Sequence, residues 1–198
     1  MAPPGTDRAE PATGSQYGTL QIISVGAIVP RKGFDVLVAA LAELSELSWR
    51  LTIVGDRSRD PPTAARLDAA IAALGLGRRI TVLDAIPAER LAELYAKADL
   101  FVLASHFEGF GMAYAEAIAR GLPVVGTTGG AIPDTVPPDA GVLVEPGDVR
   151  ALARTLELLI RNPDERRWLA DGARKAAKTL PTWPDSARLF AQALEGVA

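Results

Sequence analysis

The apolar residues of this 198-residue chain fall into short runs that alternate with amphipathic stretches. The runs at 20–25, 50–54, 79–83, 100–105 and 123–127 predict buried strands, and 142–144 predicts a further short one. Between them, apolar positions at helical spacing predict helices at 34–44, 63–74, 88–98 and 113–120. Three more helices are expected at 149–160, 164–179 and 183–194, because Asn162-Pro163 and Leu180-Pro181 interrupt the pattern. Strands that alternate with helices predict the α/β class: a doubly wound parallel sheet covered on both faces, with extra C-terminal helices.

The first 18 residues differ from the rest of the chain. Residues 1–18 are rich in Pro, Gly, Thr, Ser and charge, with almost no aliphatic side chains to bury, and predict a flexible linker. Residues 19–198 are long enough for a single core, so we expect them to form one domain.

Composition excludes several classes of function. Apolar residues make up 48% and charged residues 23%, as in ordinary globular domains, and a net charge of −3 argues against extended contact with nucleic acid. There is no cysteine and one histidine, so thiolate and histidine-rich metal sites are excluded, and no metal is expected. No apolar run approaches the ~20 residues of a transmembrane helix, and the N-terminus does not resemble a signal peptide. A cytoplasmic protein is the expectation.

Candidate ligand-binding residues lie in loops that follow strands. In doubly wound sheets, ligands bind beyond the carboxyl ends of the strands, where loops lead into helices. The first loop, 26–33, does not match the G-x-G-x-x-G turn that binds NAD. Gly129-Gly130 reads equally well as a plain turn, and His106 as an ordinary loop residue. Candidate pocket residues in these loops are Gly26, Gly55, His106, Gly129 and Gly130.

Two glutamates, Glu108 and Glu116, lie eight residues apart around the start of a predicted helix. Between them, Gly109-Phe110-Gly111 and Met112 lead into the helix, where glycines let a ligand approach unpaired backbone N–H groups. Carboxylates accept hydrogen bonds from vicinal diols, so the two can border one crevice that suits a sugar or a ribose. Two surface glutamates on a solvated helix explain the pattern equally well.

Two cations precede the first helix. Arg31 and Lys32 lie in the loop between Gly26 and Gly33, and cations beside helix N–H donors suit a pyrophosphate. The alternative is a pair of solvated basic residues in a turn.

Several motifs resemble those of one family. The segment EGFGMAYAE, from Glu108 to Glu116, continues into Ala117 and into GLPVV at 121–125, and resembles the Glu-x7-Glu motif of retaining glycosyltransferases of family 4. PGTD at 4–7 is similar to the segment that joins the two domains of these enzymes. GAIVPRKG at 26–33 resembles their G-R-x-x-x-x-K-G loop, and 127–134 resembles their T-x-x-G-G-x-P-E segment.

The resemblance implies the C-terminal donor-binding domain of such an enzyme, a Rossmann-like half of a GT-B architecture. It implies that Glu116 binds the ribose of a nucleotide-diphosphate sugar, that Glu108 and the backbone of 109–111 hold the transferred hexose as the catalytic centre, and that Lys32 faces the diphosphate. Transfer would retain the anomeric configuration without a cofactor. The acceptor would be held by a missing N-terminal domain, so this part alone would transfer little, and the parent could lie at a membrane surface.

The chain departs from the family pattern at Ala27, where the family has an arginine. Arg31, or Arg57 or Arg59 in the next loop, could supply the missing phosphate cation. Because of this departure, a non-catalytic or split-enzyme binding module stays an alternative, as does a sugar-nucleotide epimerase of similar architecture. A response-regulator or flavodoxin-like module is disfavoured, since the Glu-x7-Glu loop has no role there.

Overall fold

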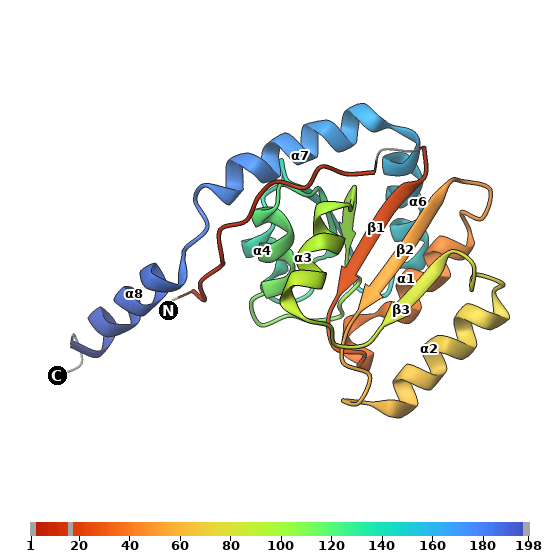
Figure 1. Ribbon diagram of the computed structural model, residues 1–198, viewed down its shortest axis with the longest axis horizontal. Coiled ribbons are helices and arrows are strands. Elements are labelled where there is room, and N and C mark those ends of the chain that lie inside the picture. The colour runs from red at the N-terminus through yellow and green to blue at the C-terminus, as the bar shows by residue number, and fades with distance from the viewer. Residues whose placement is uncertain (1–2, 16–17, 196–198) are drawn as a thin grey trace.

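The computed structural model of the protein describes residues 3–15 and 18–195. Its centre is a six-stranded, fully parallel sheet in the order β3-β2-β1-β4-β5-β6 (Figure 1). The strands are β1 (Leu20–Val25), β2 (Trp49–Val54), β3 (Ile80–Leu83), β4 (Leu100–Val102), β5 (Val124–Thr127) and β6 (Gly141–Val144). The helices are η1 (Pro30–Lys32), α1 (Phe34–Ala42), α2 (Pro61–Ala73), α3 (Ala88–Ala96), α4 (Met112–Ala119), α5 (Ile132–Thr135), α6 (Val149–Arg161), α7 (Pro163–Ala177) and α8 (Trp183–Glu195).

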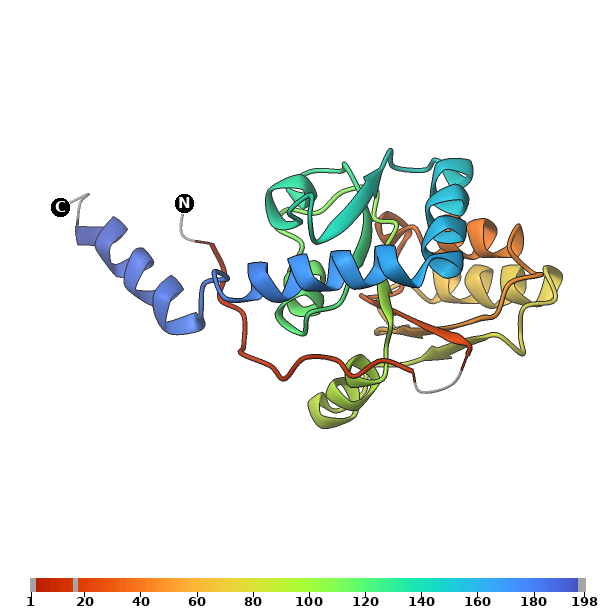
Figure 2. The same ribbon diagram turned by 90° about the horizontal axis from the view of Figure 1, so that it is seen from above.

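The expected doubly wound sheet is confirmed, because helices cover both of its faces. α1 packs against α2 and α6, whereas α4 packs against α7. Figure 2 shows α3 on the opposite side of the strands from α1 and α2. Right-handed connections require this arrangement, since the chain winds outward from β1 to β3 and then returns to β4 on the other side of β1.

Every predicted strand and helix is present, and the differences lie at their ends. β4 covers only Leu100–Val102 instead of 100–105. Leu103 N–H still donates to Val125 O (3.0 Å), and the buried residues after it form a loop in which the Ala104 carbonyl lies against Gly33, the residue after η1. The helices η1 and α5 were not predicted. Each carries a proline in its first turn and is too short to show an apolar repeat.

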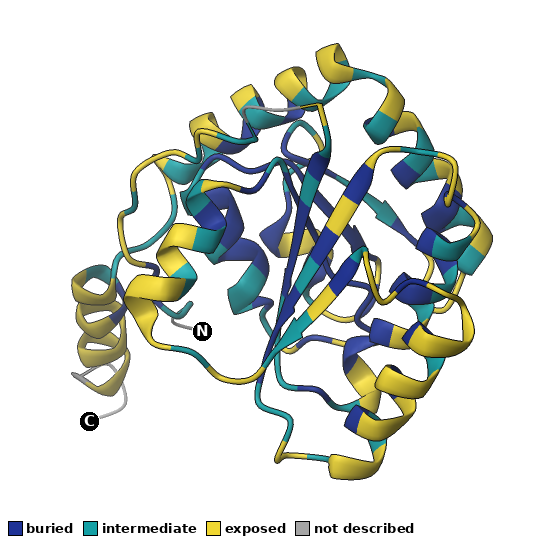
Figure 3. Ribbon diagram, turned by 45° about the vertical axis from the view of Figure 1, so that its right-hand side comes forward, coloured by how far each residue is buried: buried dark blue, intermediate teal, exposed yellow. Residues whose placement is uncertain are grey.

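Burial is greatest along the central strands, since every residue of β4 and β5 and four of the six residues of β1 are buried (Figure 3). The Phe101 ring lies 6.4 Å from the Tyr95 ring and 5.5 Å from the Tyr114 ring, measured between centroids. All three are fully buried. This aromatic stack links β4 to α3 and α4, so the loop between β4 and α4 starts from a rigid base.

The described part of the expected linker runs along the domain surface without helix or strand. Backbone hydrogen bonds tie this segment to the rest of the domain. Thr6 N–H donates to Pro181 O (2.8 Å), Ala12 N–H to Arg120 O (2.8 Å), Thr13 N–H to Ala96 O (2.9 Å) and Ser15 N–H to Asp99 Oδ1 (2.8 Å). Residues 1–2 and 16–17 of that expected linker lie outside the described residues. Beyond Pro181, α8 points away from the body of the molecule (Figure 1).

Candidate functional site

Three loops meet at the carboxyl edge of the sheet. His106 N–H donates to Arg31 O (2.8 Å), which joins the loop after β4 to the loop after β1. The loop after β5 is joined in turn, because Glu108 N–H donates to Gly129 O (3.3 Å) and Ala131 N–H donates to Glu108 O (2.9 Å). The structure therefore brings together the loops on which the sequence places its candidate residues.

The candidate glycines allow these loops to touch. A Cβ on Gly129 would overlap the His106 carbonyl, and one on Gly130, where φ is +70°, would overlap the Glu108 carbonyl. A Cβ on Gly55 would overlap the Gly26 carbonyl. These positions serve the close approach of backbone to backbone, which explains glycine there without any direct contact to a ligand.

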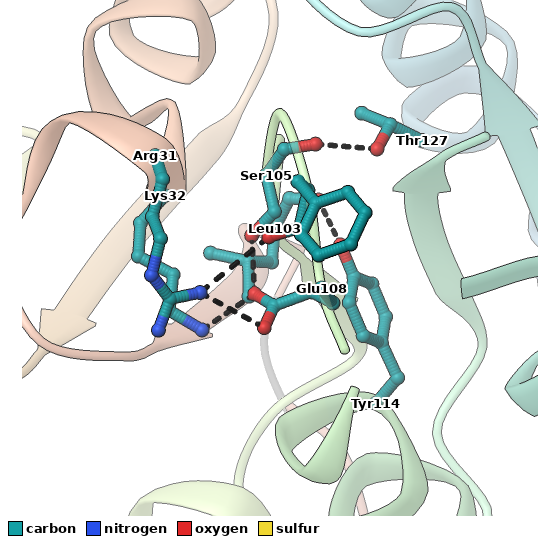
Figure 4. A network of polar contacts seen from close by, with 8 residues as sticks. Arg31, Lys32, Leu103, Ser105, Glu108, Tyr114 and Thr127 are labelled. Atoms are coloured by element: carbon teal, nitrogen blue, oxygen red, sulfur yellow. Dashed lines mark hydrogen bonds and ion pairs between the residues drawn. The ribbon is translucent and has the colours of Figure 1, made fainter. Parts of the chain in front are cut away.

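Glu108 lies at the centre of a cluster of polar side chains (Figure 4). Its Oε1 is 2.5 Å from Lys32 Nζ and accepts a hydrogen bond from Ser105 Oγ (2.6 Å), while its Oε2 is 3.2 Å from Arg31 Nη1. The Lys32 and Glu108 side chains are only 10% and 9% exposed, whereas the Arg31 side chain is 56% exposed. The two predicted cations and the first predicted carboxylate thus form one cluster.

The cluster keeps Glu108 ionised. Burial raises the pKa of its carboxyl, but the hydrogen bonds from Lys32 and Ser105 and the charges of Lys32 and Arg31 outweigh burial, and the net pKa is lower than usual. An ionised carboxylate only accepts hydrogen bonds, so Glu108 is suited to hydroxyl donors.

Backbone donors lie next to this carboxylate. Gly111, with φ at +91°, is the N-cap of α4, and no side chain caps the helix. Within the described chain, none of the N–H groups of residues 109–113 donates to a protein acceptor. Five consecutive unpaired donors at the start of a helix favour an anionic or oxygen-rich group.

Glu116 has different surroundings from Glu108. Its Oε2 accepts a 3.4 Å hydrogen bond from the Tyr95 hydroxyl, and it lines a cavity of about 180 Å³ together with Met112 and Arg120. Burial raises the pKa of Glu116 above its usual value, and Arg120 and Tyr95 offset this only in part. Glu116 thus lines a cavity on α4, while Glu108 lies in the ion-pair cluster before the helix, so their predicted sharing of one crevice stays a prediction.

The other cations proposed to replace the arginine missing at Ala27 have partners elsewhere. Arg57 pairs with Asp68 on α2, and Arg59 pairs with Asp56 of its own loop (3.2 Å). Among these three arginines, Arg31 is the one whose guanidinium contacts Glu108.

A second cavity, of about 550 Å³, lies beside Arg31 and between α1 and α2. His106 forms part of its wall, together with apolar residues that include Phe34 and Leu67. In the described part of the chain, no three His, Asp or Glu side chains gather closely enough to hold a metal ion. Among residues 3–15 and 18–195, no helix combines the length and the apolar character needed to span a bilayer.

Sequence reasoning missed Ser105, Thr127 and Arg120. Ser105 stands three residues before Glu108, at the end of a buried run, and that spacing was its one visible signal. Thr127 supports Ser105 from β5, because its hydroxyl donates to the Ser105 carbonyl (2.5 Å). This contact joins β5 to the loop after β4, and no local pattern encodes it.

The chain is similar to glycosyltransferases of several kinds. The family model "Glycosyl transferases group 1" matches residues 6–176. The D-inositol 3-phosphate glycosyltransferase of Xylanimonas cellulosilytica is 37% identical over 167 residues, which are 84% of this chain and 40% of that protein. The chain therefore spans less than half the length of this relative.

Solved structures give the same result. HepE of Anabaena, in complex with UDP and glucose, superposes with a TM-score of 0.82 at 25% identity, over 90% of this chain and 49% of HepE. The C-terminal domain of the group 1 glycosyltransferase LpcC of Francisella tularensis superposes with a TM-score of 0.76 at 27% identity. That match covers 87% of this chain and 95% of the LpcC domain. The chain belongs to the glycosyl transferases group 1 family, and its fold is that of the C-terminal half of a GT-B enzyme.

Proposed function

We propose that this chain is the donor-binding half of a retaining, family 4 glycosyltransferase, which holds a nucleotide-diphosphate sugar for transfer to an acceptor. The observation that carries the proposal is the juxtaposition of an ionised Glu108, the cations Arg31 and Lys32, and the unpaired N–H groups of residues 109–113. A diphospho-sugar needs cations and N–H donors for its phosphates and acceptors for its hydroxyls, and this edge of the sheet supplies both.

Each group has a role in this proposal. Arg31, as the more exposed cation, contacts the diphosphate with Lys32 and supplies the charge that is missing at Ala27. Glu108 and the backbone of residues 109–111 bind the hexose, and Glu116 accepts hydrogen bonds from the ribose. The acceptor attacks on the face that the nucleotide leaves, and the cations and N–H donors stabilise the charge that develops on the departing diphosphate.

The comparisons support a sugar donor and leave the acceptor open. HepE, with the same fold, was solved with UDP and glucose, and the Xylanimonas relative is named for glycosyl transfer to an inositol phosphate. Because the chain spans 40% of that relative, acceptor binding and part of the catalytic apparatus are assigned to a further domain of the full enzyme.

The first test is calorimetric titration of the chain with UDP-, GDP- and ADP-sugars, comparing the wild type with Glu116→Gln. We expect Glu116→Gln to weaken binding by about 10- to 100-fold, because hydrogen bonds to a charged group contribute ~1.5–3 kcal/mol. Glu43→Gln, an exposed glutamate at the end of α1, is the matched control and should bind as the wild type does. Equal affinity in the wild type and Glu116→Gln would exclude the ribose role.

Donor binding should also depend on pH through Glu116. Its raised pKa means that the carboxylate takes up a proton at a higher pH than an ordinary glutamate, and the protonated form accepts ribose hydrogen bonds less well. Affinity should therefore fall as the pH drops toward that pKa, starting above the range of an ordinary glutamate. The same titration with Glu116→Gln should lack this transition, so a transition that persists there would assign it to another group.

A further inference from the structure

The two oxygens of the Glu108 carboxylate have unequal partners. Oε1 meets Lys32 Nζ at 2.5 Å and Ser105 Oγ at 2.6 Å, and both of these residues are buried. Oε2 meets only Arg31 among the described side chains, at 3.2 Å, and the Arg31 side chain is 56% exposed. Oε1 is therefore held by two buried partners, and Oε2 is contacted by one exposed partner (Figure 4).

Ser105 is itself held rigidly. The residue is fully buried, and its carbonyl accepts a hydrogen bond from the Thr127 hydroxyl of β5 (2.5 Å). Since an ionised carboxylate carries no proton, the Ser105 hydroxyl donates its single hydrogen to Oε1. A short side chain on a fixed backbone has one rotatable bond to this hydroxyl, so the direction of the hydrogen bond is set by the fold.

Lys32 cannot set that direction alone. An ammonium group is a point charge with three donors on a flexible stem, and it stays paired with a carboxylate that rotates. Lys32 Nζ and the Ser105 hydroxyl both bond Oε1, but the Ser105 side chain is the shorter and more restricted of the two, so Ser105 fixes which oxygen is held from inside the protein.

We propose that Ser105 is a positioning residue that anchors Oε1 of Glu108 and so turns Oε2 toward the hydroxyls of the transferred sugar. This inference rests on the proposed function. Arg31, the exposed partner, exchanges Oε2 for the diphosphate when the donor binds, while the buried contacts of Lys32 and Ser105 stay in place. Ser105 thus affects the affinity for the sugar part of the donor, while other groups bind the nucleotide part.

The test compares a nucleotide with its sugar conjugate. Wild type and Ser105→Ala are titrated calorimetrically with two ligand pairs, UDP with UDP-glucose and GDP with GDP-mannose. For the pair that the wild type binds more tightly, the readout is the dissociation constant of the nucleoside diphosphate divided by that of its sugar conjugate. We expect Ser105→Ala to bind the nucleoside diphosphate with the wild-type affinity, and its ratio of dissociation constants to fall about tenfold because the sugar conjugate binds more weakly. A preference that stays at the wild-type value, or an equal loss for both ligands, would overturn the inference.

Two further variants separate positioning from a general defect. Ser24→Ala removes a buried hydroxyl of β1 that has no partner in the described chain, and should leave both affinities unchanged. If Ser105 acts through Glu108, adding Ser105→Ala to Glu108→Gln should not change the ratio further, and a further loss would contradict the inference. If the wild type binds neither nucleotides nor sugar conjugates, both the proposed function and the role of Ser105 are wrong. If the wild type binds them and Ser105→Ala has the same ratio of dissociation constants, only the role of Ser105 is wrong.

Discussion

Lys32→Met should lower the free energy of unfolding by about 3–5 kcal/mol at neutral pH, because it leaves the carboxylate of Glu108 buried without its closest cation. Ser105 and the exposed Arg31 remain as partners, but neither replaces an ammonium group at 2.5 Å from Oε1. Urea denaturation measures the loss. The deficit should shrink as the pH falls, since protonation of Glu108 removes the unpaired charge.

An exposed lysine provides the control for this substitution. Lys97 follows α3 and makes no ion pair within the described residues, so Lys97→Met should change stability by no more than about 0.5 kcal/mol. The double variant Lys32→Met with Glu108→Gln should regain part of the stability, because it also removes the unpaired charge. A Lys32→Met protein as stable as Lys97→Met would show that the pair is solvated in solution.

Gly33→Ala is expected to destabilise the protein by about 3–5 kcal/mol, the sum of two effects. Gly33 has φ at +61°, a left-handed conformation that alanine adopts only with strain. The added Cβ would also overlap the Ala104 carbonyl oxygen, which belongs to the fixed backbone after β4. The loop that carries Arg31 and Lys32 would have to move, so donor affinity should fall together with stability.

Gly75 separates these two effects. Its φ is +68°, close to that of Gly33, but a Cβ there would meet no atom within 4 Å. Gly75→Ala should therefore cost about 1–2 kcal/mol in urea denaturation, from strain alone. Equal losses in the two variants would mean that the loop relaxes away from Ala104 without penalty.

The sheet and its helices could be predicted because burial imposes a pattern on the sequence. β4 and β5 lie in the interior of the sheet with helices on both sides, so every residue of β4 is apolar and the strand is visible as a continuous run. The ends of the elements were less accurate. The run 100–105 continues past Val102 because the loop that follows is itself buried, and burial alone does not distinguish a strand from a buried loop.

The site could be predicted as a set of loops, but not as a set of contacts. Motif resemblance pointed to Lys32, Glu108 and Glu116, and Arg31 was a candidate because it is a second cation in the same loop before a helix. That Arg31 turns to Glu108 depends on the His106 to Arg31 backbone bond and on the left-handed turn at Gly33. The first is a contact between residues far apart in the sequence and the second is a backbone conformation, so neither can be predicted from the residues next to them in the chain.

The order of the strands has a consequence for how such a protein can diversify. β1 and β4 are neighbours in the sheet, yet the chain leaves them in opposite directions, toward β2 and β5. The loops that follow them therefore start at the switch point of the sheet, where ligands bind in doubly wound folds, and the two loops are joined there by a backbone hydrogen bond that does not depend on particular side chains. Under the proposed function, exchange of loop residues can change which sugar is recognised while the buried interior stays the same.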